Sequence, residues 1–107
     1  MKRLEASIER AVVAYAKSRK VLAFKIGNQG VRGIPDRMFL FQGRVLFCEM
    51  KRPGGKPSAL QVLMIQTLRD AGFAAVVVDN VPLGKKLIDG LVEGLPRNTV
   101  DIDESVH

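Results

Sequence analysis

Two apolar segments separated by a two-residue break constrain this chain more than any other feature of its sequence. Residues 37–41 and 44–51 are rich in aromatic and aliphatic side chains, and Gln42-Gly43 lies between them. Apolar segments of this length around a glycine-containing pair are typical of a β-hairpin. In a hairpin with a two-residue loop, Asp36 lies directly opposite Glu49. The Cβ atoms of these two acidic residues are then expected about 5 Å apart.

A lysine completes the group of ionisable side chains at this end of the hairpin. Successive side chains of a strand alternate between its faces, so Lys51 shares a face with Glu49. Like charges facing each other destabilise a sheet unless another group compensates them, as a divalent cation would. Two carboxylates beside an amine are the groups that metal-assisted phosphodiester hydrolysis requires. An Asp after Pro35 is often only a turn residue, but its convergence with Glu49 and Lys51 favours the catalytic interpretation.

Both faces of the predicted hairpin are apolar, so we expect a sheet that is covered on both sides. Cys48, the single cysteine, excludes an internal disulfide framework and is expected to be a small buried hydrophobe. The face of Asp36 carries Met38, Leu40, Val45 and Phe47, and the opposite face carries Phe39, Phe41, Leu46, Cys48 and Met50.

The periodicity of the flanking segments predicts the remaining elements. Ser58 and Gln61 have the spacing of a capping box, which predicts the start of a helix that ends at Gly72. A β-branched segment after that helix is expected to pair in parallel with residues 44–51. We therefore expect helices over residues 4–17, 59–71 and 81–95, and strands over residues 21–26, 37–41, 44–51 and 73–79. The result is a three-layer α/β domain with a central mixed sheet in the core order α-β-β-β-α-β.

Two of these helices carry apolar stripes whose partners can be predicted only in part. The stripe of the second helix is expected to face inward, and that of the last helix to form a dimer contact or to pack on the protein's own sheet. The inward residues of the second helix are Leu60, Leu63, Met64, Thr67, Leu68 and Ala71. The stripe of the last helix consists of Leu87, Ile88, Leu91, Val92 and Leu95.

Charge and composition indicate the class of partner. The 107 residues predict one domain over 1–97, followed by an acidic and loose tail over 98–107. The net charge is +6, and it is +9 without the three acids of the tail, which suits a phosphate backbone although solubility alone also explains it. Few aromatic residues are available for stacking on single-stranded bases, which favours duplex or branched substrates. No segment resembles a membrane span or a signal peptide, so we expect an intracellular protein.

These residues together resemble a known family of nucleases. Pro35-Asp36 and the Glu49-x-Lys51 triplet carry the pattern of the PD-(D/E)xK nuclease superfamily. The fuller run, with Gly33-Ile34 before Pro35-Asp36 and Gly43-Arg44-Val45 before Glu49, is similar to its virus-type replication-repair nuclease branch, VRR-NUC. The resemblance extends from about Glu5 to Asn80 and implies a restriction-endonuclease-like fold, in agreement with the element order predicted above.

The resemblance also implies roles for particular residues. Asp36 and Glu49 would bind Mg²⁺ or Mn²⁺, with the backbone carbonyl of Met50 as a further ligand. Lys51 would orient the attacking water and stabilise charge on the phosphate. An acid on the first helix often completes the metal site in this family. Of the two acids on that helix, Glu5 points closer to the apolar stripe than Glu9 does, although an ordinary solvent-facing role is the alternative for both.

Several polar residues outside the hairpin have two possible roles. Gln61 matches a glutamine that follows the E-x-K triplet in the resembled family, although capping alone explains it. Arg32, between glycines, is well placed to contact a phosphate. Arg52 and Lys56 lie in a basic loop after the hairpin and could reach DNA. For all three basic residues, a solvated loop position is the alternative.

The functional prediction is a Mg²⁺-dependent endodeoxyribonuclease that cuts branched DNA such as four-way (Holliday) junctions. A domain with one site makes one incision, whereas a junction needs two symmetric cuts, so we expect a homodimer. Stand-alone members of the resembled family, of viral or phage type, are thought of as junction resolvases, and such a protein would act in the cytoplasm of the host. The alternatives are a flap or restriction-like duplex endonuclease, a DNA-binding module without catalysis, and an unrelated basic structural protein.

Overall fold

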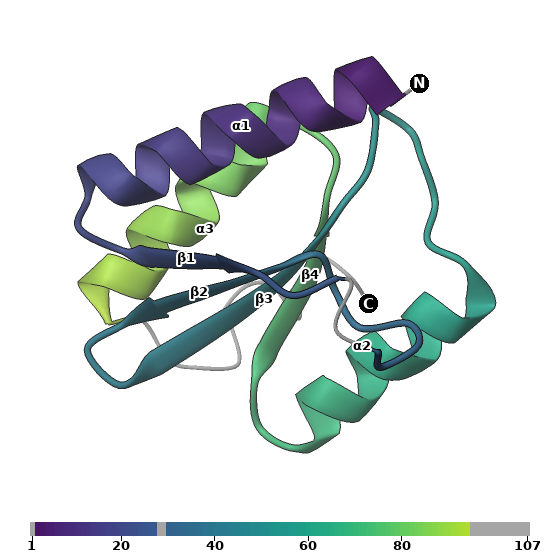
Figure 1. The fold of residues 1–107 in the computed structure, drawn as a ribbon. Helices are drawn as coiled ribbons and strands as arrows, with labels where there is room; N and C mark the ends of the chain where they lie inside the picture. Colours follow the sequence, from purple (N-terminus) through teal and green to yellow (C-terminus); the bar gives the residue numbers. More distant parts are fainter. Residues whose placement is uncertain (1, 28–29, 95–107) are drawn as a thin grey trace.

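The computed structural model describes residues 2–27 and 30–94, and it contains a four-stranded sheet between helices (Figure 1). The elements are α1 (Lys2–Ser18), β1 (Leu22–Lys25), β2 (Arg37–Phe41), β3 (Arg44–Met50), α2 (Ala59–Asp70), β4 (Ala74–Val78) and α3 (Val81–Glu93). This order confirms the predicted α/β core. The proposed boundary at residue 97 and the tail over 98–107 lie outside the described residues, so that division stays a prediction.

The strands lie in the order β1-β2-β3-β4, with antiparallel pairing except between β3 and β4, which are parallel. In the hairpin, Phe41 pairs with Arg44 and Arg37 pairs with Cys48. Both loop residues between β2 and β3 have positive φ, as a tight hairpin turn of primed type requires. The predicted register is therefore confirmed. It directs the next pair, Asp36 and Glu49, to the end of the ladder.

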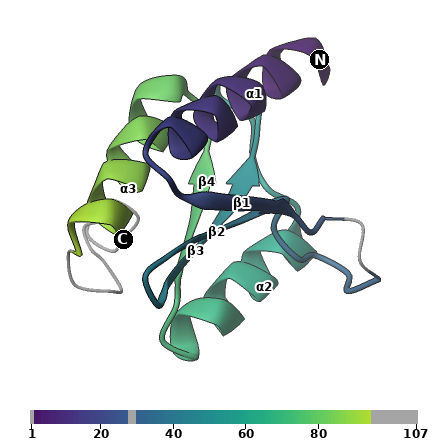
Figure 2. The same cartoon turned by 60° about the vertical axis from the view of Figure 1, so that its left-hand side comes forward.

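Helices α1 and α3 cover one face of the sheet and α2 lies on the other (Figure 2). The main core lies under α1 and α3, where Val12, Phe39 and Ile88 are completely buried. The two helices cross closely at Gly84, because a Cβ atom there would lie only 2.4 Å from Cγ2 of Val12. Glycine at this position therefore allows the backbone of α3 to pack directly on a side chain of α1.

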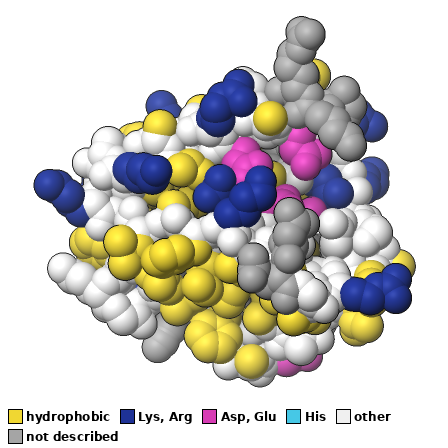
Figure 3. All heavy atoms as spheres, viewed as in Figure 1, with side chains coloured by type: hydrophobic (Ala, Val, Ile, Leu, Met, Phe, Trp, Pro, Cys, Tyr) yellow, Lys and Arg dark blue, Asp and Glu magenta, His cyan; other side chains and the backbone are white. Residues whose placement is uncertain are grey.

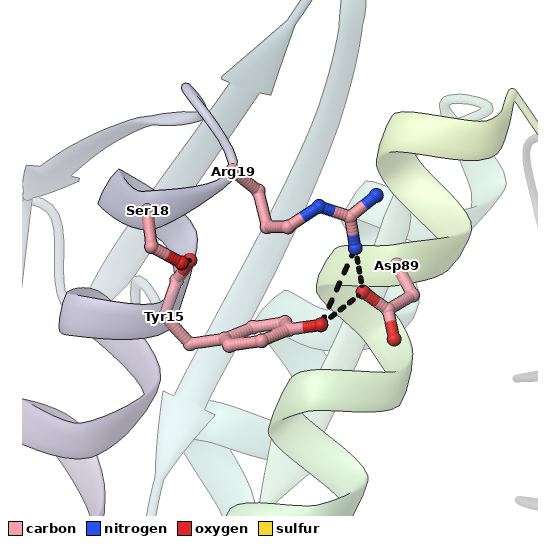
Figure 4. A network of polar contacts seen from close by, with 4 residues as sticks. All are labelled: Tyr15, Ser18, Arg19 and Asp89. Atoms are coloured by element: carbon pink, nitrogen blue, oxygen red, sulfur yellow. Dashed lines mark hydrogen bonds and ion pairs between the residues drawn. The ribbon is translucent and has the colours of Figure 1, made fainter.

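A polar network joins the end of α1 to α3 (Figure 4). The hydroxyl of Tyr15 donates to Oδ1 of Asp89 across 2.6 Å, and the guanidinium of Arg19 bonds both groups. Ser18 donates from Oγ to the carbonyl of Tyr15. Tyr15 therefore packs against the core, while its hydroxyl joins the two helices through Asp89.

The second face of the sheet is covered only in part. Helix α2 packs against β4 and buries Ile65, whereas Leu22 and Phe24 of β1 are 58% and 46% exposed on this face. The apolar surface that results is visible below the middle of Figure 3. The prediction that both faces would be covered holds for the α1–α3 side and is wrong for the β1 end of the other side.

The predicted inward face of α2 is also wrong in part. Leu63 is 62% exposed and Leu60 is 39% exposed, and Thr67 and Ala71 are exposed as well. Ile65, which the predicted stripe omitted, is the residue that α2 buries. The reason is that α2 is apolar around most of its circumference, so periodicity alone did not identify the side that meets β4.

Helix α3 uses its apolar stripe within its own domain. Leu87 and Ile88 are buried in the core under α1, and Leu91 and Val92 pack against the same core. Packing on the protein's own sheet, one of the two predicted uses of this stripe, is therefore confirmed for these residues. Leu95 lies outside the described residues. In the part of the chain that the structure describes, no helix is long and apolar enough to cross a membrane.

Candidate active site

The candidate site lies where the end of β3 meets the start of α2 and the first half of α1 (Figure 1). Asp36 stands directly before β2, and its Oδ2 accepts a hydrogen bond from the backbone N–H of Met50 across 2.9 Å. Its carbonyl accepts from the N–H of Ile26 across 2.9 Å, which continues the β1–β2 pairing by one residue. Asp36 is therefore held by both neighbouring strands rather than by a turn of its own.

Glu49 is the only charged residue that is buried among those described, with 2% of its surface exposed. Its Oε2 accepts a hydrogen bond from Nε2 of Gln61 across 2.8 Å and lies 3.6 Å from Nζ of Lys51. Its Oε1 is buried and has no hydrogen-bond partner among the described residues. Since a buried unpaired carboxylate oxygen is costly, this atom indicates a site that is built for an additional ligand.

The two carboxyl groups resist being charged together. Burial, and secondly the charge of Asp36, raises the pKa of Glu49 to about 7, against the opposing effect of Lys51. Burial also raises the pKa of Asp36, although the N–H of Met50 favours its charged form. Desolvation is the main cause in both groups, and the like charge that adds to it is Asp36 for Glu49 and Glu9 for Asp36. A cation between them would reverse both effects.

The oxygens that remain free fit a hard divalent cation. Oδ2 of Asp36 and Oε2 of Glu49 are engaged by protein donors, whereas Oδ1 of Asp36 and Oε1 of Glu49 have no hydrogen-bond partner among the described residues. Mg²⁺ binds through one or two carboxylates and keeps several waters, so two carboxylates suffice for it. Over residues 2–27 and 30–94, no set of three or more His, Cys, Asp and Glu side chains is arranged to hold a metal.

The two acids of α1 differ in their surroundings. Glu9 forms an ion pair with Arg37, whose Nε lies 2.6 Å from Oε2, and a longer one with Lys25 at 4.0 Å. Glu5 has intermediate exposure, and its charge contributes to the raised pKa of Glu49. The structure thus places Glu5 within electrostatic reach of the site without joining it to a three-ligand cluster. Its role as a metal ligand stays a prediction.

Gln61 makes both of the contacts that sequence reasoning treated as alternatives. Its Oε1 accepts from the backbone N–H of Ser58 across 2.8 Å, and Oγ of Ser58 accepts from the N–H of Gln61, which completes the predicted capping box. Its Nε2 donates to Glu49. One amide therefore caps α2 and fixes the buried carboxylate of β3.

The predicted basic residues lie at the surface. Arg32, Arg52 and Lys56 are all exposed, and DNA contact by them stays a prediction. Lys25 and Arg37, which sequence reasoning did not single out, pair across β1 and β2 and flank Glu9. The register of the first two strands was the signal that could have identified them.

Cys48 takes no part in the polar site. Burial raises the pKa of its thiol, and its side chain lies in the core under α1 and α3. The expectation that Cys48 is a small buried hydrophobe is therefore confirmed.

Comparison with known proteins identifies the class of this domain. No family model matches the chain. "Putative nuclease p44" from Acyrthosiphon pisum secondary endosymbiont phage 1 is 34% identical over 84 residues, which cover 78% of this chain and 90% of that protein. A solved structure described as "VRR_NUC domain" has a TM-score of 0.71 and 25% identity, over 79% of this chain and 94% of that chain.

Fold and sequence together therefore define a nuclease domain. The chain belongs to the VRR-NUC family, which confirms the resemblance drawn from the Pro35-Asp36 and Glu49-x-Lys51 pattern.

Proposed function

We propose that this domain is a metal-dependent endodeoxyribonuclease in which Asp36 and Glu49 hold Mg²⁺ or Mn²⁺. The observation that carries the proposal is Oε1 of Glu49, which is buried without a partner among the described residues while Gln61 and Lys51 engage Oε2. Because Oε2 is held by protein groups, the carboxylate of Glu49 is preorganised to bind a ligand through Oε1. The backbone carbonyl of Met50 and the carboxylate of Glu5 are further candidate ligands.

Each protein group then has a distinct task. The side chain of Lys51 is 20% exposed, so its ammonium is accessible from solvent as well as lying near Glu49. Its remaining N–H donors can orient an attacking water and stabilise charge on the phosphate. Gln61 holds Glu49 in one orientation. When bound, the metal supplies Lewis acidity to the scissile phosphate and to the attacking water. Asp36 and the N–H of Met50 join the site to the sheet, which makes it rigid.

DNA is the substrate that the charge of the chain favours. The net charge of +6 attracts a phosphate backbone, and the exposed Arg32, Arg52 and Lys56 lie in the loops before and after the hairpin. We propose a branched duplex such as a four-way junction, with flap or plain duplex cleavage as the alternative. Such an enzyme would act in the cytoplasm, or in that of the host if phage-encoded.

A homodimer would give such an enzyme the two cuts that a junction requires. Because Leu87 and Ile88 are used inside the domain, the contact must come from other side chains. Leu22 and Phe24 on β1 and Leu63 on α2 are apolar and exposed, and they are available to a second copy of this chain. Charged substitution of Phe24 is then expected to separate the dimer.

Substitution of the three central residues tests the chemistry. Asp36→Asn, Glu49→Gln and Lys51→Ala should each abolish cleavage, while DNA binding survives because many basic residues share it. Asp70→Asn, an exposed acid on α2, is the matched control and should cut normally. Calorimetric titration with Mn²⁺ should show binding by the parent, by the control and by Lys51→Ala, which keeps both carboxylates, and weakened binding by Asp36→Asn and Glu49→Gln. Robust cleavage by Asp36→Asn, or cleavage in EDTA, would overturn the proposal.

A substrate panel tests the finer assignment. Labelled duplex, flap, fork and four-way junction should be cut in Mg²⁺ with preference for the junction, and light scattering should give the mass of a dimer. A strict monomer at micromolar concentration that prefers flaps would contradict the junction assignment. DNA binding without cleavage in Mg²⁺ or Mn²⁺ would instead support a module that lacks catalysis.

A further inference from the structure

Gly27 lies directly beside the carboxylate of Asp36. It follows β1 at the point where the N–H of Ile26 bonds the carbonyl of Asp36. A Cβ atom built on Gly27 would lie 3.0 Å from Oδ1 of Asp36, 3.3 Å from its Cα and 3.9 Å from its Cγ. A side chain at this position would therefore press on the carboxyl group itself.

The backbone conformation does not explain this glycine. Gly30 and Gly33 in the same loop have φ angles of +88° and +81°, which only glycine adopts easily. The φ of Gly27 lies outside that left-handed region, so its backbone can accept an ordinary residue. What distinguishes the position is its neighbour, because the missing side chain leaves space at one oxygen of Asp36.

Among the described residues, that oxygen has no hydrogen-bond partner. Oδ2 of Asp36 accepts from the N–H of Met50, whereas the residues described offer no hydrogen-bond donor to Oδ1. The free oxygen thus lies on the side of the carboxylate that Gly27 keeps open. A cation bound there needs room for its waters as well as for itself, since Mg²⁺ requires near-octahedral coordination.

We infer that Gly27 is a positioning residue that keeps Oδ1 of Asp36 accessible to the divalent cation. The inference rests on the proposed function. It gives a role in metal binding to Gly27, a residue that has no side-chain functional group. A methyl group 3.0 Å from Oδ1 either displaces the carboxylate from the N–H of Met50 or covers the free oxygen with an apolar surface. Both consequences reduce metal binding, whereas DNA contacts through the basic loops are left intact.

Gly27→Ala tests the inference directly. Calorimetry with Mn²⁺ should show an affinity at least about tenfold lower than that of the parent, and Gly27→Val should lower it further. At a fixed Mg²⁺ concentration kcat should fall while KM for DNA changes little, and higher Mg²⁺ should restore part of the rate. Gly43→Ala, at the hairpin tip with no atom within 4 Å of the new Cβ, is a control for general destabilisation and should bind Mn²⁺ like the parent.

A measurement on the parent protein removes any dependence on the folding of the variants. Mn²⁺ is paramagnetic, so substoichiometric Mn²⁺ should broaden the backbone NMR signal of Gly27 well before that of Gly43. Unchanged Mn²⁺ affinity in Gly27→Ala, or a sharp Gly27 signal while that of Glu49 broadens, would overturn the inference and leave the metal site standing. Failure of the parent to bind Mn²⁺ at all would overturn the metal site and the role of Gly27 together.

Discussion

Gln61 donates a hydrogen bond from Nε2 to Oε2 of Glu49 across 2.8 Å, and the same amide accepts from the N–H of Ser58. The start of α2 is thereby joined to a buried carboxylate at the end of β3. The contact leaves Oε1 of Glu49 as the free oxygen of the carboxylate. Helix capping and the orientation of a candidate ligand therefore depend on one side chain.

Gln61→Glu should separate these two functions. A glutamate retains an acceptor for the N–H of Ser58, but it cannot donate to Glu49 and adds a third negative charge beside it. Because Glu49 then loses the donor that fixes its orientation, we expect at least a tenfold loss of Mg²⁺-dependent cleavage, and little change in helix content. Cleavage assays and circular dichroism measure the two outcomes.

Two substitutions on the same helix are controls for Gln61→Glu. Ser58→Ala removes the cap and should cost about 1 kcal/mol of stability while cleavage persists. Gln66→Ala, whose amide bonds only Asp70 among the residues described, should alter neither property. Normal cleavage by Gln61→Glu would show that the bond to Glu49 has no catalytic consequence.

The stability of the metal-free protein should fall as pH rises from about 5 to about 8. The fold raises the pKa of the Glu49 carboxyl from its ordinary value of 4.5 to about 7, so the native state holds a proton that the unfolded state has lost in this range. The contribution of Glu49 to the free energy of unfolding is fully present below its pKa in the unfolded state. It is lost as the pH rises through its pKa in the folded state, by about 3 kcal/mol for a shift of this size. Urea unfolding in EDTA at several pH values measures it.

Glu49→Gln and added metal are the two controls for this pH dependence. The glutamine cannot titrate, so its stability should change much less over the same range and should exceed that of the parent at pH 8. Saturating Mn²⁺ should stabilise the parent most at high pH, where the carboxylates are charged. A parent whose stability rises between pH 5 and pH 8 in EDTA would contradict the assignment.

Glu5→Gln and Glu9→Gln should have different effects. Glu9 is paired with Arg37, so its neutral variant should lose about 1–3 kcal/mol of stability through the weakened charged hydrogen bond. Glu5→Gln should instead reduce turnover at limiting Mg²⁺ and change stability little. Thermal unfolding and a Mg²⁺ titration of the cleavage rate distinguish them. Parental activity in both variants and in the double variant would exclude α1 from the site.

Gly84→Ala should destabilise the fold by about 1–3 kcal/mol, because its Cβ would lie 2.4 Å from Cγ2 of Val12. Val12→Ala removes the atoms that clash, so the double variant should be less destabilised than the sum of the two single changes. Urea unfolding of all four proteins gives the coupling. Additive effects would mean that α1 and α3 separate freely at this contact.

Sequence patterns predicted the hairpin and the position of its polar residues. The two-residue break determines the register, and side-chain alternation then places Lys51 on the face of Glu49, where their charged atoms lie 3.6 Å apart. The capping box could also be predicted from the sequence, because Ser58 and Gln61 lie three residues apart at the start of one helix. Local geometry controls each of these features, so one sequence is sufficient to predict them.

Contacts between distant segments were less accessible to prediction. The ion pair of Glu9 with Arg37 depends on how α1 lies over β1 and β2, which periodicity does not specify. The buried face of α2 was predicted incorrectly because apolar residues surround that helix, and only its position on β4 selects Ile65. The close approach of Gly27 to Asp36 likewise depends on the path of the chain after β1, which the sequence pattern does not specify.

The parallel pairing of β3 with β4 determines when the site can be completed on the ribosome. The backbone N–H of Lys51 donates to the carbonyl of Val78 across 2.9 Å, and Met50 pairs with Val78 in the sheet. Synthesis proceeds from the N-terminus, so Asp36 and Glu49 leave the exit tunnel before the strand that fixes the end of β3. We therefore expect a nascent chain to expose Asp36 and Glu49 before β4 supports the end of β3, and to gain nuclease activity only after β4 has emerged.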